Sequence, residues 1–237
     1  MLFDSSEQLI DHVVAQTDTA LLSFSCGKDS IGCYLALRDR IPNLIPFYLY
    51  NVPNLEFVNR SLGYFEGAMG RRIIRLPHPS LYRQLNQLVF QAPENCAIVE
   101  DARLPEFDYL DVYRVIREDN HLAPDTPVAI GVRAVDSPQR WAAMKTHGPL
   151  SESRHTFFPI FDWRADRLRD TIRESGIKLP VDYKWFGRSF DGLDYRFLSK
   201  IKTHAPADFE RILAYFPLAE LELKRMEYRE RYYADRS

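Results

Sequence analysis

Short apolar runs alternate with stretches of helical spacing along the first 176 residues, and this alternation constrains the fold more than any other feature. Five runs are typical of short buried strands, at residues 20–24, 45–50, 72–76, 127–131 and 157–161. The helical stretches lie at about 6–15, 29–40, 55–69, 79–91, 107–118, 138–145 and 164–175. Strands separated by helices pair in parallel, because each crossover helix returns the chain to the same end of the sheet. The sequence therefore predicts an α/β fold with a Rossmann-like, parallel five-stranded sheet flanked by helices.

The pattern changes after Gly176, which is expected to end the last of these helices. From residue 177 onward no strand-like run occurs, and the apolar spacing is helical with an interruption near Pro217. We predict two domains, an α/β core at 1–176 and a helical C-terminal appendage at 177–237.

Composition argues against several classes of protein. Hydrophobic residues make up 46% of the chain and charged residues 27%, and the net charge of −2 gives no overall basic field of the kind that non-specific nucleic-acid binders carry. The three cysteines form no C-x-x-C pair and the six histidines show no metal-ligand spacing, which argues against a disulfide scaffold or a zinc site. No apolar run approaches the roughly 20 residues of a membrane span. We expect a reduced, cytoplasmic protein with no membrane partner.

The segment "LLSFSCGKDSIGCYLAL" (Leu21–Leu37) joins a predicted strand to a predicted helix through a polar turn. Ligands of parallel α/β sheets bind at the carboxyl ends of strands, and a helix N-terminus presents unpaired N–H groups that attract anions. Within the turn, Gly27 allows a close approach of the backbone and Lys28 adds a positive charge suited to phosphate. The pattern indicates a phosphate-binding loop.

Asp29 is the exception in this turn, because a carboxylate beside a phosphate repels it. Its presence is explained by a magnesium ion between the two groups, or by capping of the helix. Ser25 and Ser30 offer hydroxyl donors, and Ser23 lies near the end of the strand. The alternative is a capped turn without a ligand, since serine, glycine and aspartate are common at helix starts.

The turn resembles the PP-loop, the S-G-G-x-D-S pyrophosphate-binding motif of the adenine nucleotide α-hydrolase-like superfamily, whose fold is of the HUP type. Ser25, Gly27, Asp29 and Ser30 match the motif, while Cys26 stands where its first glycine lies. The glycine spacing differs from that of a Walker A loop.

A second segment, "PVAIGVRAVDSPQR", is similar to the G-x-R-x-x-E-S-x-x-R motif of the PAPS reductase-like branch of that superfamily. Gly131, Arg133, Ser137 and Arg140 match, and Asp136 replaces the glutamate. Two arginines just past a strand end can clamp phosphate or sulfate in bidentate fashion. The alternative is that they form surface ion pairs with Asp136.

A third segment, "FFPIFDWRADRLRDTIRESGIKLP", is similar to the P-I-x-D-W segment of the same branch, so the resemblance extends over roughly residues 20–180. We predict a structural role here: Phe158, Ile160 and Trp163 pack in the core, and Asp162 caps the following helix. A direct role of Asp162 at the site is the alternative.

Two further places offer weaker candidates. Asn51 and Glu56 follow the second predicted strand, where the branch places residues around the adenosine, and they are candidate contacts to ribose or base. The alternative is that Asn51 and Pro53 only turn the chain. His78 follows the third strand, where it either touches phosphate or is hydrogen-bonded within its loop.

The resemblance implies that the core binds ATP or a related adenine nucleotide together with Mg²⁺, and that an acceptor attacks the α-phosphorus with release of pyrophosphate. Lys28, Asp29, Arg133 and Arg140 are the candidate catalytic residues, with Asp29 as the metal ligand. The candidate nucleotide-binding residues are Ser23, Ser25, Cys26, Gly27, Lys28, Asp29, Ser30, Asn51, Gly131, Arg133 and Ser137.

Cysteine placement argues against reductase chemistry. PAPS reductases use a reactive cysteine in their C-terminal part, and this chain has no cysteine after Cys96. An iron–sulfur cysteine set like that of related DNA phosphorothioation enzymes is also absent. Cys26, at a helix start beside Lys28, is a candidate nucleophile, but we favour a small residue that fills the loop. Cys33 is expected in the core.

The tail combines basic and aromatic residues in "YKWFGRSFDGLDYRF" and "ELKRMEYRERYY". Such residues either stack on nucleic acid or form a packed stripe with a solvated face, and we favour the packed stripe.

Three functions stay open at this stage. The first is an ATP pyrophosphatase or adenylyltransferase acting on an unidentified acceptor. The second is an enzyme that uses the sulfonucleotides PAPS or APS. The third is a non-catalytic nucleotide-binding module that acts with a partner protein, in phage or mobile-element nucleic-acid modification. A homodimer or a partner protein is the expected assembly.

Overall fold

The computed structural model describes residues 3–234 and contains one six-stranded sheet, in the order β3-β2-β1-β4-β6-β5. Its strands are β1 (Thr19–Ser23), β2 (Asn43–Tyr50), β3 (Ile74–Pro77), β4 (Val128–Ile130), β5 (Leu150–Ser151) and β6 (Thr156–Phe157). Strand β1 pairs in parallel with both β2 and β4, and β4 pairs in parallel with β6. This topology confirms the predicted Rossmann-like α/β fold.

The sheet has one strand more than predicted, because β5 adds an antiparallel edge to β6. Only Leu150 and Ser151 form it. Two residues are too few to show an alternating pattern in the sequence, so the strand was missed. The predicted strand at 157–161 is likewise reduced to Thr156 and Phe157.

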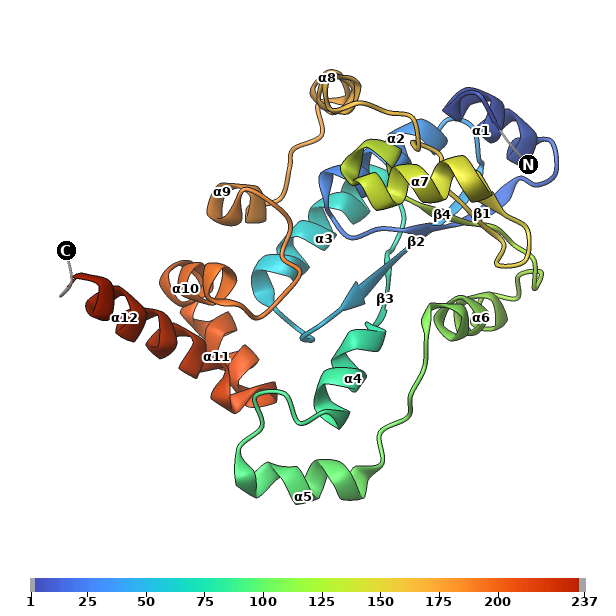
Figure 1. The fold of residues 1–237 in the computed structure, drawn as a ribbon. Helices are drawn as coiled ribbons and strands as arrows, with labels where there is room; N and C mark the ends of the chain where they lie inside the picture. Colours follow the sequence, from blue (N-terminus) through green and yellow to red (C-terminus); the bar gives the residue numbers. More distant parts are fainter. Residues whose placement is uncertain (1–2, 235–237) are drawn as a thin grey trace. The chain divides into compact units, whose positions relative to one another are not determined.

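Helices cover both faces of the sheet, as Figure 1 shows. On one side lie α1 (Ser6–Val14), α2 (Lys28–Leu37) and α8 (Ala165–Ser175), and on the other lies α6 (Tyr109–Asp119). The interior between these layers is apolar: Leu21 and Leu22 of β1 are fully buried, and Phe47 of β2 packs edge-on against Tyr113 of α6. Burial of these side chains supplies most of the driving force for folding.

Local sequence explains how the helices of this layer begin, end and pack. Ser5 caps α1 by accepting a hydrogen bond from the Gln8 backbone. Gly176 ends α8 in the left-handed conformation, as predicted. Helix α2 approaches α8 closely through Gly32, because a β-carbon there would lie only 2.3 Å from the end of the Leu168 side chain.

The predicted capping role of Asp162 is wrong. Helix α8 begins after Arg164, which provides no side-chain cap. The Asp162 carboxylate instead accepts hydrogen bonds from the backbone N–H, at 3.1 Å, and the hydroxyl of Ser6 at the start of α1. Asp162 therefore satisfies an N-terminal donor of a helix distant in sequence, a partner that local pattern cannot reveal.

Contacts divide the chain into two compact units. Unit 1 comprises the described residues up to Leu49, then Phe65–Leu76 and Asp108–Pro180, and it holds most of the sheet. Unit 2 comprises Tyr50–Tyr64, Pro77–Phe107 and the described residues from Val181 onward. The division into domains 1–176 and 177–237 stays a prediction.

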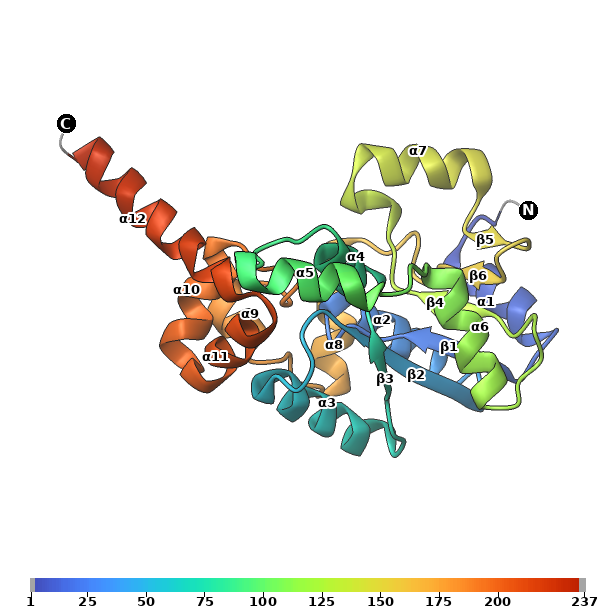
Figure 2. The same cartoon turned by 90° about the horizontal axis from the view of Figure 1, so that it is seen from below.

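Unit 2 is helical, and Figure 2 shows its last helices, with α12 extending beyond α10 and α11. Its C-terminal elements are α9 (Asp182–Phe186), α10 (Tyr195–His204), α11 (Pro206–Tyr215), η2 (Pro217–Glu220) and α12 (Leu221–Ala234). The remaining helices are the N-terminal part of α3 (Glu56–Met69), α4 (Pro79–Asn86) and α5 (Pro93–Ala102). None of the helices within residues 3–234 is long and apolar enough to cross a membrane.

The single helix predicted at 79–91 is wrong in extent. Helix α4 ends at Asn86, and Leu88 and Phe90 both adopt positive φ angles, of 55° and 54°, before α5 begins. Apolar residues at left-handed positions give no breaker signal of the kind that glycine or proline gives. The break therefore escaped the sequence pattern.

Aromatic packing holds unit 2 together and confirms the packed stripe for the first tail segment, whereas Tyr228 and Tyr232 of the second segment are exposed. Phe57 of α3 lies 5.4 Å from Trp185 and 5.6 Å from Phe190, measured between ring centroids. Phe197 of α10 adds an edge contact to Phe190 at 5.5 Å. Asp208 of α11, almost fully buried, caps α3 by accepting hydrogen bonds from two of its first N–H groups.

Candidate functional site

Two loops leave the same edge of the sheet at the point where the strand order reverses. The chain runs outward from β1 to β2 and β3, and β4 then pairs on the other side of β1. Ser23 at the end of β1 is paired with Ile130 at the end of β4, so the loops that follow start side by side. Open parallel sheets bind their ligands at such a switch point.

The first loop, residues 24–27, places a left-handed residue where the PP-loop motif has its first glycine. Cys26 adopts a φ of +59°, and its side chain is only 4% exposed. Gly27, the residue before α2, has an extended backbone with φ of −75°. The conformation that favours glycine therefore falls on Cys26 rather than on Gly27.

Hydrogen bonds within the first loop hold its shape. The Ser30 hydroxyl, which is buried, donates to the Gly27 carbonyl at 2.8 Å. The exposed Ser25 hydroxyl donates to Ser30 Oγ at 3.3 Å and accepts from the Gly27 N–H at 3.4 Å. These bonds present the first turn of α2 toward the edge of the sheet, where the positive end of the helix dipole favours an anion.

The second loop, residues 131–137, touches the first turn of α2 through Gly131. A β-carbon at Gly131 would lie 2.7 Å from the carbonyl carbon and oxygen of Asp29 and 2.9 Å from the Ser30 nitrogen. Real β-carbons do not approach backbone atoms so closely, so glycine is required here. The two motifs are thereby brought into direct contact.

Five side chains of alternating charge connect the two loops. Lys28 Nζ lies 2.7 Å from Asp29 Oδ2, and Arg133 Nε lies 2.7 Å from Asp29 Oδ1. Arg133 Nη2 then contacts Asp136 at 2.7 Å, and Asp136 contacts Arg140 Nη1 at 2.9 Å. Arg133 and Arg140 thus form the ion pairs with Asp136 that were considered as an alternative. The predicted phosphate clamp would use the same two guanidinium groups.

The cationic side chains of Lys28, Arg133 and Arg140 differ in burial, and this difference indicates different roles. The Arg133 side chain is 5% exposed and lies between two carboxylates, as a buried charge requires. It also contacts the Trp163 carbonyl at 3.5 Å. The side chains of Lys28 and Arg140 are 44% and 50% exposed, so these two can turn toward a ligand while Arg133 positions Asp29 and Asp136.

Asp29 is the residue that could hold a metal ion. Its Oδ1 atom is buried and accepts no directed hydrogen bond among the described residues, although Arg133 Nε is close. No group of three or more histidine, cysteine, aspartate or glutamate side chains forms a metal site within residues 3–234. Coordination of Mg²⁺ by Asp29, with nucleotide phosphates as the other ligands, stays a prediction.

Two predicted binding residues have structural partners. Ser137 caps α7 (Pro138–His147), because its hydroxyl accepts a hydrogen bond from the Arg140 backbone at 3.1 Å. Asn51 belongs to unit 2, where it accepts a hydrogen bond from the Ser80 hydroxyl at 2.7 Å. Ser80 in turn donates its backbone N–H to His78, whose pKa is lowered by burial and by Arg83. Binding of a ligand by Ser137 or Asn51 stays a prediction.

Asp136 is the residue whose importance sequence reasoning underestimated. Sequence reasoning matched it to the motif glutamate or treated it as a surface partner of the arginines and gave it no role at the site, whereas it contacts both Arg133 and Arg140. The signal was present in the sequence, because the three residues are spaced i, i+3 and i+7 and a helical turn places them together.

Comparison with known proteins finds no matching family model and no matching curated protein. Among solved structures, U34-tRNA thiolase NcsA of Methanococcus maripaludis with its 4Fe–4S cluster matches with a TM-score of 0.46 and 14% identity, over 91% of this chain and 79% of that chain. The NH3-dependent NAD synthetase of Campylobacter jejuni, in complex with nitrate, matches with a TM-score of 0.44 and 10% identity, over 93% and 92%. We therefore argue function from the residues of this chain.

Proposed function

We propose that this protein is a PP-loop enzyme of the PAPS reductase-like type that binds ATP and cleaves it between the α and β phosphates. The observation that carries the proposal is the contact between the two motif loops at the switch point of the sheet, where Gly131 rests against the backbone of Asp29. Two motifs that are a hundred residues apart in sequence meet where a nucleotide is expected.

The start of α2 and four charged side chains have separate roles in the proposed nucleotide binding. The first turn of α2 offers N–H groups and its positive dipole end to the pyrophosphate. Lys28 and Arg140 neutralise phosphate charge from the two sides of the site, because both side chains are accessible. Asp29 holds a magnesium ion, which supplies charge stabilisation for the phosphates when bound. Arg133 keeps Asp29 in place.

The proposed reaction is an in-line displacement at the α-phosphorus. An oxygen of the acceptor forms a bond to this phosphorus, the bond to the bridging oxygen of the β-phosphate breaks, and pyrophosphate leaves with the electron pair. The products are the adenylated acceptor and pyrophosphate. Such a reaction depends mostly on positioning and on charge stabilisation of the leaving group, for which cationic side chains around the phosphates suffice.

Calorimetric titration with α,β-methylene ATP and Mg²⁺ tests the binding step. Asp29→Asn removes the metal ligand and weakens two ion pairs, whereas Asp39→Asn changes an exposed aspartate just after the same helix and serves as the control. We expect binding by the native protein and by the control, and at least about tenfold weaker binding by Asp29→Asn. Absence of binding to the native protein would contradict the proposal.

Release of AMP and pyrophosphate in single-turnover assays tests the chemical step. Lys28→Ala should reduce this release, because it removes an accessible cation beside the proposed phosphate position. A clear preference for PAPS over ATP in competition would favour the sulfonucleotide enzyme instead. Tight nucleotide binding without turnover, altered by a partner protein, would favour the non-catalytic module.

A further inference from the structure

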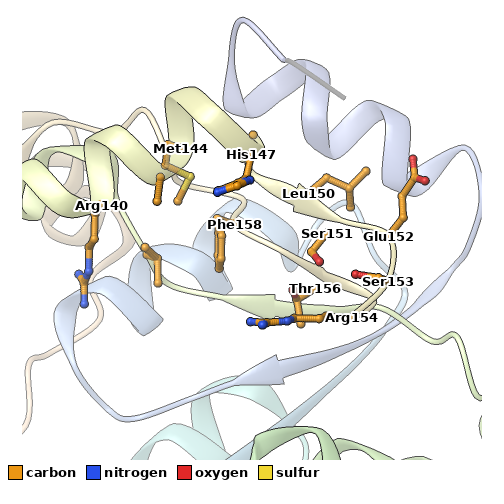
Figure 3. Close-up of a pocket in the computed structure, with 13 residues that line it drawn as sticks. Arg140, Met144, His147, Leu150, Ser151, Glu152, Ser153, Arg154, Thr156 and Phe158 are labelled. Carbon is orange, nitrogen blue, oxygen red and sulfur yellow. The ribbon is translucent and has the colours of Figure 1, made fainter.

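Unit 1 and unit 2 each contain an open pocket with basic residues in its wall. The pocket of unit 1, of about 820 Å³, lies between α7 and the turn that joins β5 to β6. Its two arginines, Arg140 and Arg154, lie at opposite ends, as Figure 3 shows, and Glu152 adds a carboxylate to the wall. This pocket therefore offers no continuous cationic surface to a ligand.

The pocket of unit 2 lies where α9 packs against α10 (Figure 2). Its volume of about 470 Å³ falls within the range of small-molecule sites, about 300–1,000 Å³. Arg188 comes from the loop between the two helices, and Arg196 and Lys200 come from α10. None of the described residues that line this pocket carries a carboxylate. The wall therefore favours an anionic ligand.

The three cations of this pocket are accessible to a ligand. The side chains of Arg188 and Arg196 are 53% and 71% exposed, and they pair with Asp191 and Asp194 of the same loop. Exposed ion pairs of this kind contribute little to stability, so a phosphate group can replace the aspartate as partner. Lys200 is also exposed, and it forms no ion pair with any residue that the structure describes.

The cations lie along a row. The guanidinium groups of Arg188 and Arg196 are both 5.9 Å from the centre of the Phe197 ring, so they are at most twice that distance apart. Along α10 the lining residues extend from Tyr195 to Thr203, a rise of about 12 Å at about 1.5 Å per residue. A row of this length exceeds one phosphate group and suits the successive phosphates of a nucleic-acid strand.

One aromatic ring of the pocket is available to a base. Trp185 stacks on the His204 imidazole at 5.1 Å, and Phe186 meets Phe197 edge-on at 5.0 Å, so these rings belong to the packed stripe. Tyr195 is half-buried and contacts no other aromatic ring within residues 3–234. Its ring, at the first position of α10, can stack on a base that is exposed in a single strand.

We propose that this surface of unit 2 binds single-stranded nucleic acid, with one base on Tyr195 and neighbouring phosphates on Lys200, Arg196 and Arg188. The net charge of −2 confines such binding to a local surface, because no overall basic field attracts the strand. The proposal goes beyond the ATP cleavage proposed above and does not depend on it, since every lining residue belongs to unit 2.

Fluorescence anisotropy with a fluorescein-labelled oligothymidylate of about ten nucleotides tests the charged contacts. Lys200→Gln removes one cation of the row. Lys224→Gln is the matched control, since Lys224 is also exposed, lies in α12 outside the pocket wall and changes the net charge equally. We expect the native protein and the control to bind equally, and Lys200→Gln at least about fivefold more weakly, with the slope of log affinity against log salt reduced by about 0.7.

Tyr195 provides a test that does not depend on charge. Tyr195→Ala should weaken binding at least about tenfold without changing the salt dependence, because it removes the stacking ring and no charge. Tyr195→Phe keeps the ring and should bind as the native protein does. Native affinity in either Lys200→Gln or Tyr195→Ala, or no binding by the native protein, overturns the proposal while the nucleotide site of unit 1 stands.

Competition separates a strand from a free nucleotide. Thymidine monophosphate should displace the labelled strand only weakly, because it reaches one phosphate position of the row. A duplex of the same length should also compete poorly, since its bases are already stacked on one another. Thymidine monophosphate that binds as tightly as the strand would assign the pocket to a free nucleotide, and a duplex that binds as tightly would exclude base stacking. Either result overturns the proposal.

Discussion

At the scale of single residues, the most informative feature is Cys26. It is held at a φ of +59°, a conformation that costs an L-residue about 1–2 kcal/mol relative to glycine. The PP-loop motif has glycine at this position, and this chain keeps the backbone conformation without the glycine. The loop shape is thus imposed by its surroundings, including the buried Ser30 hydroxyl that donates to Gly27.

Substitution of Cys26 tests this conformation. Cys26→Gly relieves the steric cost but loses a buried side chain and gains unfolded-state entropy, so its free energy of unfolding should stay within about 1 kcal/mol of the native value. Cys26→Val, with a branched β-carbon, should lose about 2 kcal/mol or more. Urea unfolding measures both. A valine variant as stable as the native protein would show that residue 26 is not left-handed in solution.

Asp182 is the residue from which a pH dependence is expected. Burial raises the pKa of its carboxyl group, although the Phe190 N–H donates to it. The folded state therefore holds the proton more tightly than the unfolded state, and the stabilisation present at low pH is lost as pH rises through the folded-state pKa. At neutral pH an ionised carboxylate buried in unit 2 lowers stability.

Asp182→Asn removes this titration and keeps an oxygen that accepts from Phe190. We expect the melting temperature of the variant to gain on that of the native protein as pH rises from about 4 to about 8. Thermal melts at several pH values check this, with Asp39→Asn as an exposed control. Melting temperatures of native and variant protein that run parallel over this range would contradict the expectation.

At the scale of elements, the decisive contact is that of the second loop with α2. It depends on the missing side chain of Gly131, and the row from Lys28 to Arg140 connects the same two elements. Neither loop forms the site alone: the first leads into the N-terminus of α2, and the second supplies Arg133 and leads into α7 with Arg140. The distance between the second loop and α2 is therefore the quantity that a test mutation should change.

Gly131→Ala should push the two elements apart. The new β-carbon would meet backbone atoms of Asp29, which cannot rotate away, so we expect a loss of about 1–3 kcal/mol in stability and weaker nucleotide binding. Gly67→Ala in α3 is the control: its β-carbon meets no atom within 4 Å, and alanine should stabilise the helix by up to about 1 kcal/mol. Equal nucleotide affinity in both variants would disprove the importance of the contact.

At the scale of the whole molecule, the chain forms two units with different interiors. Unit 1 is built on the sheet and contains both loops, whereas unit 2 is helical and centred on aromatic rings such as Phe57 and Phe197. The proposed phosphate contacts of Lys28 and Arg140 lie entirely in unit 1. Ligand binding should therefore stabilise the two units unequally.

Hydrogen exchange measures this difference. Saturation with α,β-methylene ATP and Mg²⁺ should slow exchange at the first turn of α2 and in residues 131–137, while exchange in α12 should not change. The ligand-free protein provides the reference for every peptide. Protection confined to α10–α12 would place the nucleotide in unit 2 and contradict the proposed site.

Prediction from sequence succeeded where a pattern is local and long enough. The apolar runs at 20–24 and 45–50 became β1 and β2, and the left-handed Gly176 ended α8 as expected. It failed where only two or three residues determine the local structure, as in β5 and in the break between α4 and α5. In those places tertiary contacts override a weak local preference.

The sequence by itself determined the alternation of strands and helices, the turn before α2 and the residue types at both motif loops, because periodicity, glycine and charge act locally along the chain. Only the tertiary structure decided that Gly131 touches Asp29, that Arg133 is buried between two carboxylates and that Asp162 accepts hydrogen bonds from Ser6 of α1 instead of capping α8. These are contacts between residues distant in sequence. They depend on the order and register of strands, which become defined only when the apolar faces of separate elements pack together.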